Sequence, residues 1–242
     1  MITEAHTLSV SGIRVSVVRK SIKNLHLGVY PPDGRVRVAA PLAVTDAAVR
    51  VAVIGKLPWI RRQRASFAQQ ARESEREMVS GESHYYLGRR YRLQIVSTEG
   101  SALVELRGHK TLVLRCSLDS TPVERARLLQ RWYRERLREL APMLLDKWQA
   151  ELGVKVREWG IKRMKTKWGS CNPKARRIWL NLELIKKPPA ALEYVVVHEL
   201  IHLLARNHDE RFLRCMDHHL PSWRHRRREL NAAPLAQAVW GC

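Results

Sequence analysis

Long apolar runs are missing from this sequence, and its first residues do not resemble an export signal. No stretch of the 242 residues approaches the apolar length that crosses a bilayer. The segment from Met1 to Val10 is polar at several positions and lacks both a basic start and a long apolar run. We therefore expect a soluble, cytoplasmic protein without a membrane partner.

Cysteine is scarce, and its spacing does not suggest a metal site. The four cysteines lie far apart and form no Cys-x-x-Cys pair, which argues against a disulfide framework and against a zinc knuckle. We expect four free thiols: Cys116, Cys171, Cys215 and Cys242.

Acidic residues are few: 23 Asp and Glu stand against 44 Lys and Arg, and the formal net charge is +21. A field of this sign concentrates polyanions, either nucleic acid or phosphorylated small molecules, around a protein. No nucleic-acid-binding module, Walker-type glycine loop or Asp-rich metal motif accompanies the charge. Nucleic-acid binding through a basic surface is therefore one alternative, and the simpler one is solvated helix faces.

The most informative motif is His198-Glu199-Leu200-Ile201-His202. Four residues of helix advance about 400°, one turn plus about 40°, so the two histidines lie on one face and can share a metal ion. Chance produces this pattern roughly 0.03 times in a chain with ten histidines. The motif therefore predicts a metal site on a helix.

The apolar residues around the motif fall on the opposite arc of the same helix, which anchors it in a core. They are Leu192, Val196, Val197, Leu200, Ile201, Leu203 and Leu204. Pro188 and Pro189 suit a first helical turn, where a missing N–H costs nothing. We expect the helix to run from about Pro188 to Arg206.

His208 supplies the third ligand, since it follows just after the expected helix end, where Asn207 tolerates a left-handed turn. Three histidines hold one Zn²⁺ per chain, or another divalent metal, and leave the fourth position open for water. In this interpretation Glu199 is the general base, which takes a proton from that water and passes it to a leaving group.

A structural zinc site normally has four protein ligands, and only three are evident here. The motif therefore favours a zinc-dependent hydrolase over a basic nucleic-acid-associated protein with a structural metal site. Cys171 is a poor candidate for a nucleophile, because the nearby histidines are better used by the metal.

Several residues near the motif keep two interpretations. Tyr194, one turn before His198, either stabilises an oxyanion or packs. The segment Ile178 to Leu184 either pairs with an extended peptide or belongs to the core. Asp209, Glu210 and Asp217 are the acidic candidates for orienting a ligand imidazole. The basic cluster 224–228 either touches an anionic substrate or meets solvent.

In the N-terminal half, short apolar runs alternate with turn-forming residues. Over the first forty residues this pattern predicts a small antiparallel meander. Thr45 or Asp46 caps a short helix, a charged helix follows from Leu57, and four short strands follow between Tyr85 and Leu114.

The C-terminal half begins with a helix signal at Ser120 or Thr121, and Pro142 is expected to kink or divide that helix before Gly153 ends it. Strands are expected at 154–159, 162–167 and 178–184, the last two around a turn at 168–173. Asp209 caps a further helix, and Pro221 precedes a final charged one.

Three blocks of the C-terminal half are specific in combination, and a looser likeness continues through the N-terminal half. The blocks are Met164 to Cys171, Ile178 to Asn181, and Leu192 to His202 followed by Asn207, His208 and Phe212; the looser positions are 17–21, 59–60 and 86–88. In these residues the chain resembles the YgjP-like metallopeptidases, a bacterial family related to the SprT-like and WLM zincins.

The resemblance implies a zincin-type domain with His198, His202 and His208 as ligands and Glu199 as catalytic base, the same assignment as the spacing. It implies hydrolysis of peptides, with nucleoside triphosphates, notably UTP, as the alternative substrate of a pyrophosphatase. We expect an α+β protein: a β-rich N-terminal platform over 1–118, then a zincin-like domain over 119–242. That domain should contain an active-site helix and a small antiparallel sheet.

Overall fold

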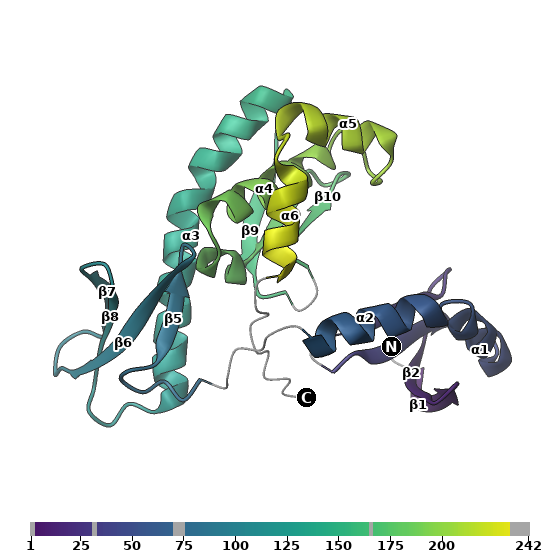
Figure 1. The fold of residues 1–242 in the computed structure, drawn as a ribbon, viewed down its shortest axis with the longest axis horizontal. Coiled ribbons are helices and arrows are strands. Elements are labelled where there is room, and N and C mark those ends of the chain that lie inside the picture. The colour runs from purple at the N-terminus through teal and green to yellow at the C-terminus, as the bar shows by residue number, and fades with distance from the viewer. Residues whose placement is uncertain (1–2, 31–32, 70–75, 165–166, 233–242) are drawn as a thin grey trace. The chain divides into compact units, whose positions relative to one another are not determined.

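The computed structural model describes residues 3–30, 33–69, 76–164 and 167–232 (Figure 1). These residues form two compact units, one up to Gln69 and one from Arg76 to Ala232, and each has its own hydrophobic core. Helices and small sheets occur together, which confirms the predicted α+β class. Among the described residues no helix has the length and apolarity needed to span a membrane. Lys165, Thr166 and Cys242, which entered the predictions, lie outside the described residues.

The first unit is a four-stranded sheet with two helices. Its strands, in spatial order, are β1 (Thr3–Val10), β2 (Ile13–Lys20), β4 (Arg35–Pro41) and β3 (His26–Tyr30). The prediction of an antiparallel meander is wrong, because β4 inserts between β2 and β3 and runs parallel to β2. Helices α1 (Asp46–Ile54) and α2 (Leu57–Gln69) follow, and Thr45 caps α1.

A second sheet with the same topology opens the second unit. Its strands, in spatial order, are β5 (Ser83–Tyr86), β6 (Arg89–Ser97), β8 (Thr111–Cys116) and β7 (Leu103–Arg107). The directions also match those of the first sheet: β5 and β7 are antiparallel to their neighbours, and β6 is parallel to β8. The chain thus contains one sheet module twice, although the residue pattern does not predict a repeat.

Local details of the two modules coincide at a constant offset of 76 residues. The first hairpin turns through Ser11 and Gly12 with φ of 48° and 76°, and the second through Leu87 and Gly88 with φ of 49° and 79°. Two consecutive residues of positive φ are the signature of the tight turn that suits twisted hairpins. After each sheet a threonine, Thr45 or Thr121, accepts a hydrogen bond at the start of the next helix.

The long helix α3 (Pro122–Leu152) connects the second sheet to the rest of the unit (Figure 1). Thr121 and Glu124 form a reciprocal capping box at its start, and Gly153 ends it with φ of 62°. The sequence predicts a kink or a division at Pro142; the division is wrong, because the helix continues through this residue. Proline inside a helix costs about 3 kcal/mol, but the burial of Ala141 and Leu145 on either side offsets that cost.

Three short strands follow: β9 (Glu158–Lys162), β10 (Gly169–Asn172) and β11 (Arg177–Asn181). The sheet is mixed rather than antiparallel, since β11 lies in the centre, antiparallel to β10 and parallel to β9. The segment 169–172, predicted as part of a turn, is an edge strand. Its Gly, Ser, Cys and Asn are typical of turns, and only the partner strand reveals its extended form.

The last elements are η1 (Leu182–Lys186), α4 (Pro189–Ile201), α5 (Glu210–His219) and α6 (Trp223–Ala232). The β5–β6 turn contacts the start of α4: the N–H groups of Leu87 and Gly88 donate to Ile185 and Lys186 of η1. A Cβ on Gly88 would lie 2.9 Å from Cγ of Pro188, so only glycine allows this approach. The predicted boundary between 118 and 119 falls inside this second unit, in the connection between β8 and α3.

Candidate metal centre

Helix α4 forms because apolar side chains surround it on most sides, and Leu200 and Ile201 are fully buried. It ends at Ile201 and not at Arg206 as predicted. After Ile201 the chain tightens into turns in which Leu203 and Leu204 donate to carbonyls three residues back. The shortened helix leaves His202 at its C-terminal cap, still one turn beyond His198.

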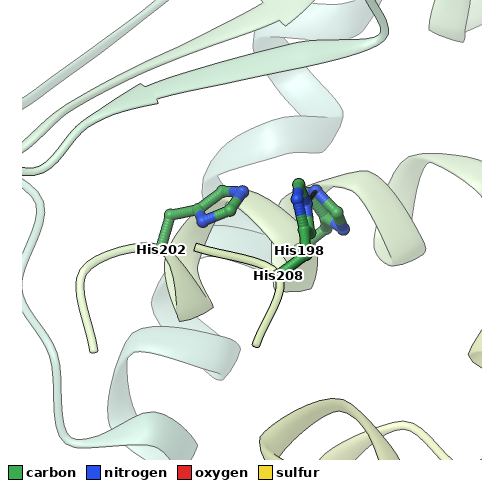
Figure 2. A group of neighbouring side chains, drawn as sticks. All are labelled: His198, His202 and His208. Carbon is green, nitrogen blue, oxygen red and sulfur yellow. Dashed lines mark hydrogen bonds between the residues drawn. The ribbon is translucent and has the colours of Figure 1, made fainter. Parts of the chain in front are cut away.

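His208 reaches the two helical histidines from the loop before α5, where Asp209 accepts a hydrogen bond from the N–H of Phe212 and caps that helix. One ring nitrogen from each of the three histidines lies within 4.8 Å of the other two (Figure 2). Nε2 of His208 is 3.0 Å from Nε2 of His198. The structure therefore brings together all three residues that the spacing predicts as ligands.

Burial favours the neutral form of the His198 and His202 imidazoles, which is the form that binds metals. Desolvation, followed by the neighbouring His202 and His208, lowers the pKa of His198 to about 3. Desolvation also lowers the pKa of His202. Three histidine nitrogens at this separation fit a Zn²⁺ ion, whose bonds to histidine nitrogen are about 2.0 to 2.1 Å long.

A backbone carbonyl orients one of the rings. Nδ1 of His202 donates to the carbonyl oxygen of Ala205 at 3.2 Å, which leaves Nε2 as the nitrogen with a free lone pair. Nδ1 of His198 is buried without a hydrogen-bond partner among the described residues.

None of the acidic candidates orients a ring in the described structure. Asp209 caps α5, Glu210 pairs with Arg214, and Asp217 accepts hydrogen bonds from Arg224 and from Nε1 of Trp223. The sequence did not predict the role of the Ala205 carbonyl, because every residue has a backbone carbonyl and the residue type does not show which one accepts a hydrogen bond.

The carboxyl group of Glu199 is buried beside the histidines, with only 5% of the residue exposed. Desolvation raises its pKa to about 8, although the charge of Lys167 acts in the opposite direction. A Cβ on Gly169 would lie 2.7 Å from Cγ and Oε1 of Glu199. The carboxyl group therefore occupies space that exists only because residue 169 is glycine, a role that sequence reasoning did not assign.

The centre opens into a cavity of about 1000 Å³ with walls from β10, α4, α5 and α6. β10 lines it and has a strand neighbour on one side only, whereas β11 lies between two strands. The segment 178–184 thus has the core role rather than the peptide-pairing role, and Ile178, Leu180 and Leu184 are fully buried.

Tyr194 and Cys171 also line the cavity, and burial affects both side chains. The ring of Tyr194 packs edge-on against His198 at 5.8 Å between centroids, and desolvation raises the pKa of its hydroxyl. Burial, followed by the charge of Glu199, raises the pKa of Cys171 to about 11. The thiol is therefore protonated at neutral pH, which agrees with its exclusion as a nucleophile.

Cys116, Cys171 and Cys215 are free, as predicted.

Comparison with known proteins places this geometry in a family. The model of the YgjP-like metallopeptidase domain matches residues 23–233. Among solved structures, the metallopeptidase zymogen abylysin of Pyrococcus abyssi shares 21% identity over 37% of this chain and 90% of its own, with a TM-score of 0.35. The metallopeptidase zymogen jannalysin of Methanocaldococcus jannaschii shares 21% identity over 37% of this chain and 92% of its own, with a TM-score of 0.34.

No curated protein matches the chain. The family match spans most of the sequence, including both halves of the second unit and the three histidines. It confirms the family that the sequence motifs resemble, and the chain belongs to the YgjP-like metallopeptidases.

Proposed function

We propose that this protein is a zinc-dependent peptidase in which His198, His202 and His208 hold one zinc ion per chain and Glu199 is the general base. The observation that supports this proposal is that three imidazoles and one buried carboxyl group face the same cavity. Three protein ligands leave a coordination position open, as catalytic zinc sites do.

A bound zinc ion would lower the pKa of the attacking water and polarise the scissile carbonyl group. Glu199 supplies the proton transfers. Its pKa of about 8 belongs to the protein without metal, and a cation nearby favours the ionised form that can accept a proton. The carboxyl group then passes this proton to the leaving amine. The tight contact with Gly169 restricts its position while it does so.

The free side of β10 is suited to hold the substrate. A peptide in extended conformation can add to an edge strand through main-chain hydrogen bonds, independent of most of its sequence. Gly169 to Asn172 line the cavity next to Glu199, so a peptide bound along them would pass the histidines.

The test compares zinc-loaded wild type with Glu199→Gln on unfolded proteins. The variant should keep zinc, measured by elemental analysis, and lose about 100-fold to 10,000-fold in turnover, because the proton acceptor is gone. Glu210→Gln is the matched control, since that carboxylate is largely exposed and, among the described residues, pairs only with Arg214. Full activity of Glu199→Gln would show that another group is the base.

Hydrolysis of nucleoside triphosphates is the second candidate, and one observation favours it. The cavity wall carries four cationic side chains: Lys167, Lys174, Arg206 and Arg227. The same two proteins should therefore be assayed with nucleoside triphosphates. Phosphate release by wild type alone, with proteins left intact, would replace the peptidase by this function.

A further inference from the structure

Helix α6 presents one face to the cavity. Three of its residues, Trp223, Arg227 and Asn231, line the cavity wall, and they are spaced four residues apart. Residues at this spacing lie on the same side of a helix. Arg227 is the cationic member of this row.

Contacts with α4, α5 and the core fix the orientation of the helix. Trp223 is buried, and its Nε1 donates to Asp217 at 2.8 Å. Nη1 of Arg226 donates to Glu193 of α4 at 2.7 Å, and Leu230 is buried in the core. The backbone of Arg227 is therefore held at the cavity by the contacts of Trp223, Arg226 and Leu230.

Arg227 differs from Arg224, His225 and Arg226 in having no acidic partner among the described residues, and it differs from Arg228, which also has none, in lining the cavity. In the basic cluster 224–228, Arg224 pairs with Asp217, His225 with Glu229 and Arg226 with Glu193. No ion pair joins Arg227 to any residue in the described part of the chain. Its side chain lies on the same cavity wall as His198 and Tyr194.

The surroundings leave this charge uncompensated. Glu199 is the one carboxyl group on the described cavity wall, and it makes no ion pair with Arg227 in the described part of the chain. A guanidinium group offers two parallel N–H donors that match a carboxylate, and partial removal of water strengthens the pairing.

We propose that Arg227 is a specificity-determining residue that binds a carboxylate of the peptide, so that the enzyme selects peptides with a carboxylate close to the bond that is cut. The inference rests on the proposed peptidase function. The carboxylate comes from an acidic side chain or from the C-terminus of the peptide.

Binding is measured first, in zinc-loaded protein that also carries Glu199→Gln, so that no probe is consumed. The probes are three acetylated alanine pentapeptides: glutamate in the centre with an amidated C-terminus, glutamine in the centre with an amidated C-terminus, and glutamine in the centre with a free C-terminus. Arg227→Met is compared with Arg228→Met. Arg228 is the matched control, because it is exposed on the same helix and does not line the cavity.

The better of the two carboxylate peptides should lose about 10-fold to 100-fold in affinity with Arg227→Met, as expected for a hydrogen bond to a charged group. Arg228→Met should leave it unchanged, and the uncharged peptide should be insensitive to both. Which carboxylate peptide responds identifies the source. Equal or absent binding of charged and uncharged peptides, or equal losses in the two variants, would overturn the inference.

Cleavage is measured second, on an unfolded protein with the cut sites read by mass spectrometry. In the chain with Glu199 intact, Arg227→Met should raise KM for acidic sites and leave kcat within about 2-fold, since the contact is the same before and during reaction. Failure of the wild type to cut any protein would contradict the peptidase function. If Arg227→Met and the wild type cut the same sites with the same KM, the role of Arg227 would be contradicted while the peptidase function would stand.

Discussion

At the scale of single residues, two carboxyl groups on α4 show how position sets chemistry. Burial raises the pKa of Glu199 to about 8. Burial acts in the same direction on Glu193, but hydrogen bonds from Arg226, Lys147 and Trp148 outweigh it and lower its pKa. The carboxyl group of Glu199 is thus held where a negative charge is unfavourable, which is typical of residues that transfer protons.

Glu199→Gln should therefore stabilise the metal-free protein at alkaline pH. The folded state retains a proton that the unfolded state releases above about pH 4.5, so stability falls as pH rises from 4.5 to 8. The gain from the substitution should be absent below pH 4.5 and approach an upper bound of about 5 kcal/mol above pH 8. Thermal melting with a chelator at pH 4 and pH 8.5 measures it.

Glu193→Gln is the control on the same helix and has the opposite sign. Its folded pKa is depressed, so its contribution is present at neutral pH and lost in acid. The substitution should lower Tm at pH 8.5. A lower Tm in both variants would mean that the folded protein stabilises the ionised carboxylate of Glu199, contrary to this prediction.

The sequence predicted that three histidines lie together, and it did not predict the contacts that hold the site in place. Helical spacing is a local property of the chain, so the residue pattern alone was enough to group His198, His202 and His208. The contact of Gly169 with Glu199 and the hydrogen bond from His202 to Ala205 join segments through space. Residue types carry no sign of such contacts.

At the scale of elements, helix starts were predictable and sheet partners were not. Thr45, Thr121 and Asp209 cap helices as expected, because a cap is a local hydrogen bond. The parallel pairing of β2 with β4 and of β9 with β11 joins strands that are not consecutive. Pro142 also lies inside α3, between the buried residues Ala141 and Leu145.

The repeated hairpin turn offers a matched pair of substitutions. Gly12→Ala introduces a side chain at φ of 76° with no atom within 4 Å, and should cost about 1 to 2 kcal/mol. Gly88→Ala meets the same strain and also Pro188 at the start of α4, so it should cost about 2 to 4 kcal/mol. Chemical denaturation measures both.

Zinc affinity separates the two variants further. Displacing Pro188 moves the helix that carries His198, so Gly88→Ala should weaken zinc binding in a chelator competition, and Gly12→Ala should not. Equal zinc affinities would mean that the β5–β6 turn does not position the metal helix.

At the scale of the whole molecule, the second unit holds both a complete core and the metal centre. Residues of β6 and β8, among them Leu93 and Leu114, share one core with Trp132 of α3 and with α4. Tyr133 of α3 also donates from its hydroxyl to the carbonyl of Tyr85 at 2.8 Å. The sheet and the helices of this unit should therefore fold together.

Two fragments test where the chain divides. A fragment of residues 74–233 should fold and bind one zinc ion, because it keeps this core. A fragment of residues 119–242, which starts at the predicted boundary, exposes the apolar side of α3 and should aggregate. Circular dichroism, light scattering and zinc content distinguish them. Full zinc binding by the shorter fragment would support the boundary at 118.

The repeated sheet module also bears on the order of events during synthesis. A ribosome adds about 5 to 20 residues per second, so the offset of 76 residues gives the N-terminal copy a lead of about 4 to 15 s. Small domains fold within this time, so the strands of the first copy are already paired when those of the second emerge. Refolding from urea releases both copies at once and allows strands to exchange between them. The yield of active protein after such refolding should therefore fall below that of native expression, and equal yields would show that the two modules do not compete.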